Sequence, residues 1–226
     1  FDLVVEGLHV ERVARVLELE DVAVSGHLDL TLSVKGPADD PVIEGNFTLE
    51  DPSLAGVLLT RVAGELEYRG KEAGVSVEAW QGERKVLSAV GPVPFDLSLS
   101  EVQSRLVGRP MDVLVVADSL DAAVALAYFG TLEDVVGTVS GEVLVRGLPE
   151  APEPDGVMTL STGGWSIEVL GVRHSDVDGT VTLNPDRTAE VDLTLNATGR
   201  AEVTGTVILD PISDPGLDLQ LTMQGF

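Results

Sequence analysis

Three consecutive residues, His174, Ser175 and Asp176, are of the types that a hydrolytic triad uses. In such a triad the histidine takes a proton from the serine hydroxyl and the aspartate orients the histidine. The surrounding sequence predicts a β-strand, and consecutive residues of a strand point to alternate faces. The three side chains therefore cannot converge, and we expect no catalysis at this motif.

The three histidines, His9, His27 and His174, lie in unrelated contexts, and none is paired at a spacing typical of metal ligands. The chain has no cysteine, which excludes thiolate chemistry. Its Asp-rich turns, at 39–40 and 210–214, match neither the EF-hand loop nor the glycine-rich calcium nonapeptide. Phosphate-loop, dinucleotide and nucleophile-elbow motifs are also missing. We expect no catalytic residue, no metal site and no cofactor, and hence no enzyme.

The net charge and the amino-acid composition of the chain limit the classes of binding partner and of fold that we expect. With 38 acidic against 14 basic residues, the net charge is -24. Nucleic acid binding needs clustered Lys and Arg, so no nucleic acid partner is expected. Hydrophobic residues make up 44% of the chain and aromatic residues only 4%, so Val and Leu supply most of the apolar surface. This bias favours β-strands.

Strict alternation of apolar and polar residues dominates the local pattern and predicts strands with one dry and one wet face. The clearest segments are 27–34, 65–68, 95–99, 180–183, 190–196, 201–207 and 217–223. One-sided strands are typical of an antiparallel sheet, because parallel sheets are covered on both faces. Turns are expected at 36–41, 184–187 and 210–216, where Pro, Gly, Asp and Asn cluster. The fold class is therefore mostly β.

The chain nearly repeats itself. Residues 24–26, Val-Ser-Gly, return at 139–141, which is 115 positions later. The opening Phe1-Asp2-Leu3 returns as Met111-Asp112-Val113 and again as Leu217-Asp218-Leu219. These matches predict a first repeat of about 110 residues over 1–110, a second over 111–216, and the start of a third over 217–226.

Each repeat contains one segment with helical spacing. The first helix is expected at about 9–19 and the second at about 119–129, where Ser119 is a plausible N-cap. Alanine richness strengthens the second prediction. One repeat then comprises a strand, a short helix and about six further strands.

The dry strand faces allow two interpretations. They could close into a core, as in most β domains. They could instead line an open apolar groove that carries a hydrophobic molecule. The second interpretation is favoured by one-sided strands with few large aromatic side chains, and by the lack of a hinge-like linker between the repeats.

The repeat resembles that of TamB and the wider AsmA-like family. The resemblance lies in a Ser-Gly strand with alternating apolar residues, Val24-Ser25-Gly26-His27-Leu28-Asp29-Leu30, followed by Gly36, Pro41 and Gly45. The second copy departs from this pattern after Gly147, where three prolines precede Gly156. The resemblance covers essentially the whole chain.

The resemblance implies an elongated antiparallel sheet rolled into a U-shaped groove, or β-taco. Proteins of this kind are anchored in the inner membrane of diderm bacteria, span the periplasm, and act in phospholipid transport, outer-membrane biogenesis and protein secretion. The implied partners are phospholipid acyl chains and, through regions outside this segment, a BamA-like outer-membrane barrel.

If this reading holds, the groove is lined by the alternating apolar residues of the predicted strands. The expected lining is Leu28, Leu30, Leu32, Val34, Leu66, Tyr68, Leu97, Leu99, Val181, Leu183, Val191, Leu193, Leu195, Val203, Val207, Leu217, Leu219 and Leu221. The alternative is a pair of tandem β-sandwich domains from an adhesin-like extracellular protein, since their size matches the repeat length.

Overall fold

The computed structural model describes residues 1–10, 24–54, 57–126, 133–167, 172–196, 200–210 and 215–224. Most of these residues lie in β-strands, and a short helix, α2, covers Ala122–Leu126. The predicted mostly β fold class is therefore confirmed.

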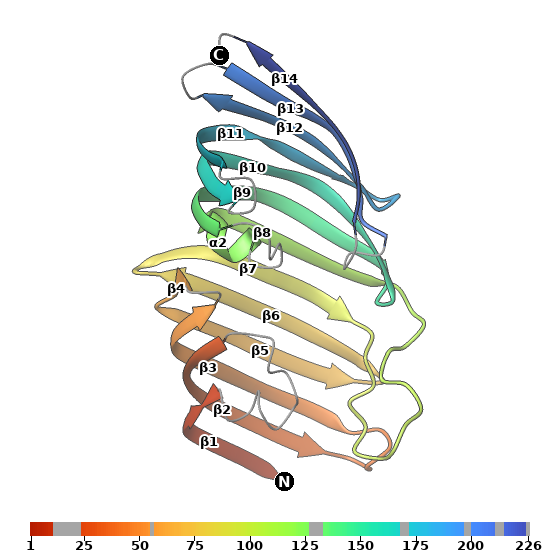
Figure 1. The fold of residues 1–226 in the computed structure, drawn as a ribbon. Coiled ribbons are helices and arrows are strands. Elements are labelled where there is room, and N and C mark those ends of the chain that lie inside the picture. Colours follow the sequence, from red (N-terminus) through yellow and green to blue (C-terminus); the bar gives the residue numbers. More distant parts are fainter. Residues whose placement is uncertain are drawn as a thin grey trace. The chain divides into compact units, whose positions relative to one another are not determined.

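The strands form a 14-stranded antiparallel sheet whose neighbours follow chain order (Figure 1). The order is β1-β2-β3-β5-β6-β7-β8-β9-β10-β11-β12-β13-β14, and β4 pairs with β3 outside this path. Sequential antiparallel neighbours need only short turns. The predicted turns at 36–41 and 184–187 are confirmed, since they separate β2 from β3 and β11 from β12.

The chain divides into two compact units. The first comprises Phe1–Val115 and Val145–Pro152, and the second comprises Val116–Leu144 and Glu153–Phe226. Within the first lie β1 (Asp2–His9), β2 (Val24–Lys35), β3 (Val42–Leu54), β4 (Val57–Leu58), β5 (Arg61–Arg69), β6 (Glu72–Gln81) and β7 (Arg84–Val93). Both units share β8 (Met111–Asp121), β9 (Glu133–Leu148) and β10 (Ala151–Ile167), and the second holds β11 (Val172–Asn184), β12 (Thr188–Asn196), β13 (Arg200–Ile208) and β14 (Gly216–Gln224).

The pairing register keeps the alternating patterns of neighbouring strands in phase. In the first unit, Leu30 of β2 lies opposite Phe47 of β3, which lies opposite Gly64 of β5. Directly opposed residues point to the same face, so apolar residues meet apolar residues across the sheet. A register slip of one residue would turn every apolar side chain of a strand to the wet face.

Two glycines show why some strand positions carry no side chain. A Cβ at Gly64 would lie 2.5 Å from the Phe47 ring, which occupies that space. Gly91 has φ +151° and would place a Cβ 2.0 Å from the carbonyl oxygen of Asp112. Only glycine fits both the backbone angle and the close strand contact at position 91.

The second predicted helix is shorter than expected. It begins at Ala122, and Ser119 is not its N-cap because Ser119 belongs to β8, with φ +54°. Asp121 caps it instead: its carboxylate accepts a 2.9 Å hydrogen bond from the Ala123 N–H. Residues 127–129 of the expected helix lie outside the described residues, as do residues 11–19 of the first expected helix. His9 ends β1, and Val10, the next residue, is helical.

The strand expected at 95–99 does not form. Phe95 makes only an isolated bridge to Leu106, and residues 96–98 belong to no strand. Pro94 supplies no N–H for a ladder. Asp96 accepts a 2.9 Å hydrogen bond from the Ser98 N–H, which turns the chain.

Candidate functional site

In the second unit, the apolar face of β11–β14 is continuous. Four lines of directly opposed residues cross these strands: Val177-Leu195-Ala201-Met223, Gly179-Leu193-Val203-Leu221, Val181-Val191-Gly205-Leu219 and Leu183-Ala189-Val207-Leu217. All ten of the predicted lining residues in this part of the chain lie on this face. The structure therefore brings them together on four neighbouring strands.

Burial on this face falls toward β14. Val177 is 0% exposed, Leu195 4% and Ala201 5%, whereas Met223 in the same line is 59% exposed. Leu217, Leu219 and Leu221 of β14 are also exposed. A row of exposed apolar side chains on one strand is unfavourable to hydrate, and an apolar ligand bound over it would remove that surface from water.

The opposite face of the same strands is polar. Its three main lines are Asp178-Thr194-Glu202-Thr222, Thr180-Asp192-Thr204-Gln220 and Thr182-Glu190-Thr206-Asp218. No two carboxylates are directly opposed in these lines, because a threonine separates them. This arrangement avoids the like-charge repulsion that directly opposed acids would cause.

The first unit has the same division. The predicted residues of β2 and β5, namely Leu28, Leu30, Leu32, Val34, Leu66 and Tyr68, lie on one face. Sequence reasoning missed further residues of this face: Ile43, Phe47 and Leu49 of β3, and Val75 and Val77 of β6. Their alternation was detectable at 43–49, but Gly45 interrupts it.

Leu97 and Leu99 do not extend this face as a strand. Both lie in residues 94–106, which we call the cover segment. Leu97 packs against the buried cluster of Ile43, Tyr68 and Ala73. Leu99 is 57% exposed, and its N–H bonds the Ala38 carbonyl at 2.7 Å. The cover segment thus lies on the apolar face, with Leu97 inserted and Leu99 directed to water.

Partly buried polar contacts hold the cover segment. The Tyr68 hydroxyl accepts a 2.9 Å hydrogen bond from the Leu97 N–H. The Asp96 carboxylate, 5% exposed, lies 3.0 Å from the Lys71 ammonium. The guanidinium of Arg105 donates to the carbonyls of Asp96 and Ser98 at 2.9 and 2.6 Å.

The charge state of this contact is well defined. The Ser98 N–H, followed by the Lys71 ammonium, lowers the pKa of Asp96 to about 2. Hydrogen bonding to Asp96 and its negative charge raise the pKa of Lys71 above its usual value. The pair is therefore ionised at neutral pH and serves as a structural contact.

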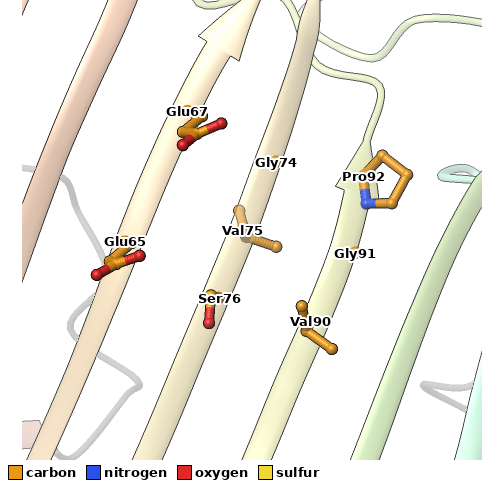
Figure 2. A pocket seen from close by; sticks show the side chains of 8 residues that line it. All are labelled: Glu65, Glu67, Gly74, Val75, Ser76, Val90, Gly91 and Pro92. Carbon is orange, nitrogen blue, oxygen red and sulfur yellow. The ribbon is translucent and has the colours of Figure 1, made fainter.

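The polar face of the first unit carries a shallow hollow of about 290 Å³. Figure 2 shows its lining on β5, β6 and β7: Glu65, Glu67, Gly74, Ser76, Val90 and Pro92 at polar-face positions, with Val75 and Gly91 between them at apolar-face positions. Gly74 contributes no side chain, which leaves the space open. The lining offers two carboxylates and one hydroxyl, without the histidine that would activate a serine.

The motif at 174–176 lies in β11 at a bulge, where the pairing with β10 shifts register and Asp176 has φ +54°. Among the described residues, no group of three or more His, Asp or Glu side chains is arranged to hold a metal ion. Within the same residues, no helix is long and apolar enough to cross a membrane.

Comparison with known proteins adds no relative. No protein family, no curated protein and no solved structure matches the chain. The likeness to AsmA-like proteins therefore stays a prediction from the repeat pattern. The site is described by its own geometry: one apolar sheet face in each unit, partly covered in the first and open along β14 in the second.

Proposed function

We propose that the chain is a non-catalytic segment of a periplasm-spanning bridge, whose apolar face shields lipid acyl chains during phospholipid transport to the outer membrane. The observation that carries this proposal is the in-phase division of the strands into an apolar and a polar face in each unit. The exposed apolar side chains of β14 give a lipid chain a surface to contact.

Physical chemistry makes such a surface useful. Exposing a chain of about 16 carbons to water costs on the order of 12 kcal/mol, at ~0.8 kcal/mol per methylene. An apolar face lowers this barrier because the acyl chain stays in apolar contact while the head group stays in water. Leu and Val side chains make only non-directional apolar contacts, so poor selectivity among lipids is expected.

The finer fold is part of the proposal. The sheet would curl lengthwise into a groove with the apolar face inside. Bulges support this, because a bulge bends its strand and increases the local twist. Register shifts put an extra residue in β1 between Val5 and Leu8, in β10 between Leu160 and Gly163, and in β11 between His174 and Val177.

The repeat is also proposed, with one unit over 1–110, a second over 111–216 and a third beginning at 217. Equivalent backbone angles support it. Gly26 and Gly141, 115 positions apart, have φ +138° and +153°. The tight turns at Lys71 and Arg187 have φ +62° and +63°. By strand order, β1, β8 and β14 then begin successive six-stranded units.

The setting follows from the same resemblance. The parent protein would be anchored in the inner membrane of a diderm bacterium and would meet a BamA-like barrel through regions outside this segment. The sandwich alternative has less support, because it needs two sheets packed face to face and the described strands follow one sheet order.

The test is transfer of a fluorescent phospholipid between vesicles, with lipid extraction from the purified chain. The disruptive variant combines Leu30→Asp with Leu193→Asp, one change on the apolar face of each unit. The matched control combines Thr31→Asp with Asn196→Asp, which adds the same charge to the polar faces of the same strands.

Loss of lipid binding and transfer in the apolar-face variant alone, with circular dichroism unchanged, is the expected result. A chain that carries no lipid and transfers none, although folded, would overturn the proposal. Binding of unfolded outer-membrane protein strands in place of lipid would show that the ligand of the apolar face is a protein and not a lipid.

A further inference from the structure

Two histidines that are distant in sequence lie side by side on the polar face of the first unit. His9 of β1 is the register partner of His27 of β2, and their ring centroids are 4.7 Å apart at an interplanar angle of 52°. Both residues are exposed. Their spacing in sequence gives no sign of this contact, because the pairing of β1 with β2 makes it.

The bulge in β1 creates this pairing. The register shifts between Val5 and Leu8, so Leu8 meets Leu28 on the apolar face and His9 meets His27 on the polar face. If the strands paired regularly from Val5 onward, without a bulge, Leu8 would lie opposite His27. The Gly7 N–H at the bulge donates a 2.7 Å hydrogen bond to the Asp29 carboxylate, which fixes the bulge.

The geometry of the pair suits one shared metal ion. An ion about 2.0 to 2.1 Å from one nitrogen of each ring, at bond angles of about 90 to 109°, places the centroids about 4.5 to 5.2 Å apart. The 4.7 Å separation lies in this range. The rings are tilted by 52° and are not stacked face to face.

We propose that His9 and His27 bind one borderline transition-metal ion, Cu²⁺ or Zn²⁺. Imidazole nitrogen prefers these ions, while Ca²⁺ and Mg²⁺ prefer oxygen. Since no third His, Asp or Glu completes a metal-binding group among the described residues, water fills the other positions. The ion joins β1 to β2 and stabilises their pairing by linkage.

The experiment is calorimetric titration of chain purified without a polyhistidine tag, with Cu²⁺ and Zn²⁺ separately, in excess Ca²⁺. Excess Ca²⁺ occupies carboxylate sites on this acidic chain, which leaves imidazole binding visible. The variants are His9→Asn and His27→Asn. His174→Asn, which changes the third histidine of the chain, is the matched control.

We expect one ion per chain, with Cu²⁺ bound more tightly than Zn²⁺. Each variant at positions 9 and 27 should weaken binding at least tenfold, and the control should bind as the unmodified chain does. Electron paramagnetic resonance of the Cu²⁺ complex should show two nitrogen ligands, which tests the site without any variant.

Binding that survives both substitutions, disappears in excess Ca²⁺, or shows only oxygen ligands would overturn the proposal. The inference does not depend on lipid transport. The pair lies on the polar face, so either result leaves the lipid assay unaffected.

Discussion

Two stretches of the apolar face have the same alternating pattern and different surroundings. Under the cover segment, Ile43, Tyr68 and Ala73 are 7%, 2% and 5% exposed. On β14, Leu219 and Leu221 are 43% and 53% exposed. The strand pattern decides which face is apolar, whereas burial depends on what lies over that face and on the neighbouring strands: all nine residues of β14, the last strand in the sheet order, are exposed. A covered stretch contributes mainly stability, and an open stretch is free to bind.

The largest expected effect compares one charge placed in each stretch. Ile43→Asp puts a carboxylate into the covered cluster and removes a packed side chain, so it should cost about 4 kcal/mol or more. Leu221→Asp, at a half-exposed position, should cost about 1 kcal/mol or less. Urea unfolding followed by circular dichroism measures both. Equal losses in the free energy of unfolding would show that the two stretches are equally buried.

A smaller effect isolates the attachment of the cover segment. Tyr68→Phe keeps the ring and removes the hydroxyl that accepts the Leu97 N–H. The expected loss is about 1 kcal/mol, the usual net value of one hydrogen bond. Hydrogen exchange should rise at Leu97 and not along β14. Unchanged exchange at Leu97 would mean that apolar packing alone holds the segment.

Sequence reasoning could predict the apolar face because alternation and register are local properties. Leu28, Leu30 and Leu32 fall on one face of any strand that contains them. It could not predict that residues 95–99 would leave the sheet, since their alternation is equally good. Pro94, the Asp96 carboxylate and a distant tyrosine hydroxyl decide that segment.

The histidine pair was beyond prediction for a related reason. His9 and His27 meet only because β1 has a bulge, and the sequence near Gly7 does not indicate a bulge. The N-cap of the second helix was assigned to the wrong one of two good capping residues. Ser119 takes a strand position with positive φ, and Asp121 caps the helix. Close competition between capping residues cannot be resolved without the tertiary contacts.

The ion pair beneath the cover segment predicts a pH dependence. The pKa of Asp96 falls from 3.8 to about 2 on folding, so the folded chain binds fewer protons than the unfolded chain between these values. Its stabilisation is complete above about pH 5 and is lost as the pH falls through about 2. Lys71, whose pKa rises, contributes below its unfolded pKa of 10.5 and loses that contribution as the pH rises through its higher folded pKa.

Urea midpoints of the unmodified chain and of Asp96→Asn, measured from pH 2 to 7, test this. The difference between the two should shrink as the pH falls. Lys71→Met should remove only part of the effect, because the Ser98 N–H is the first cause of the shift. A constant difference across this range would refute the assignment.

The smallest effect concerns the polar face behind the open stretch. Thr194 lies between Asp178 and Glu202 in one cross-strand line. Thr194→Asp would place three carboxylates in a row and should cost a few tenths of a kcal/mol, up to about 1 kcal/mol, at low salt. The loss should shrink in about 0.5 M salt, because exposed charges are screened. Thr194→Lys should instead stabilise slightly at low salt. Thermal unfolding of the three chains at both salt concentrations measures this, and a salt-independent loss would point to lost threonine packing rather than to charge spacing.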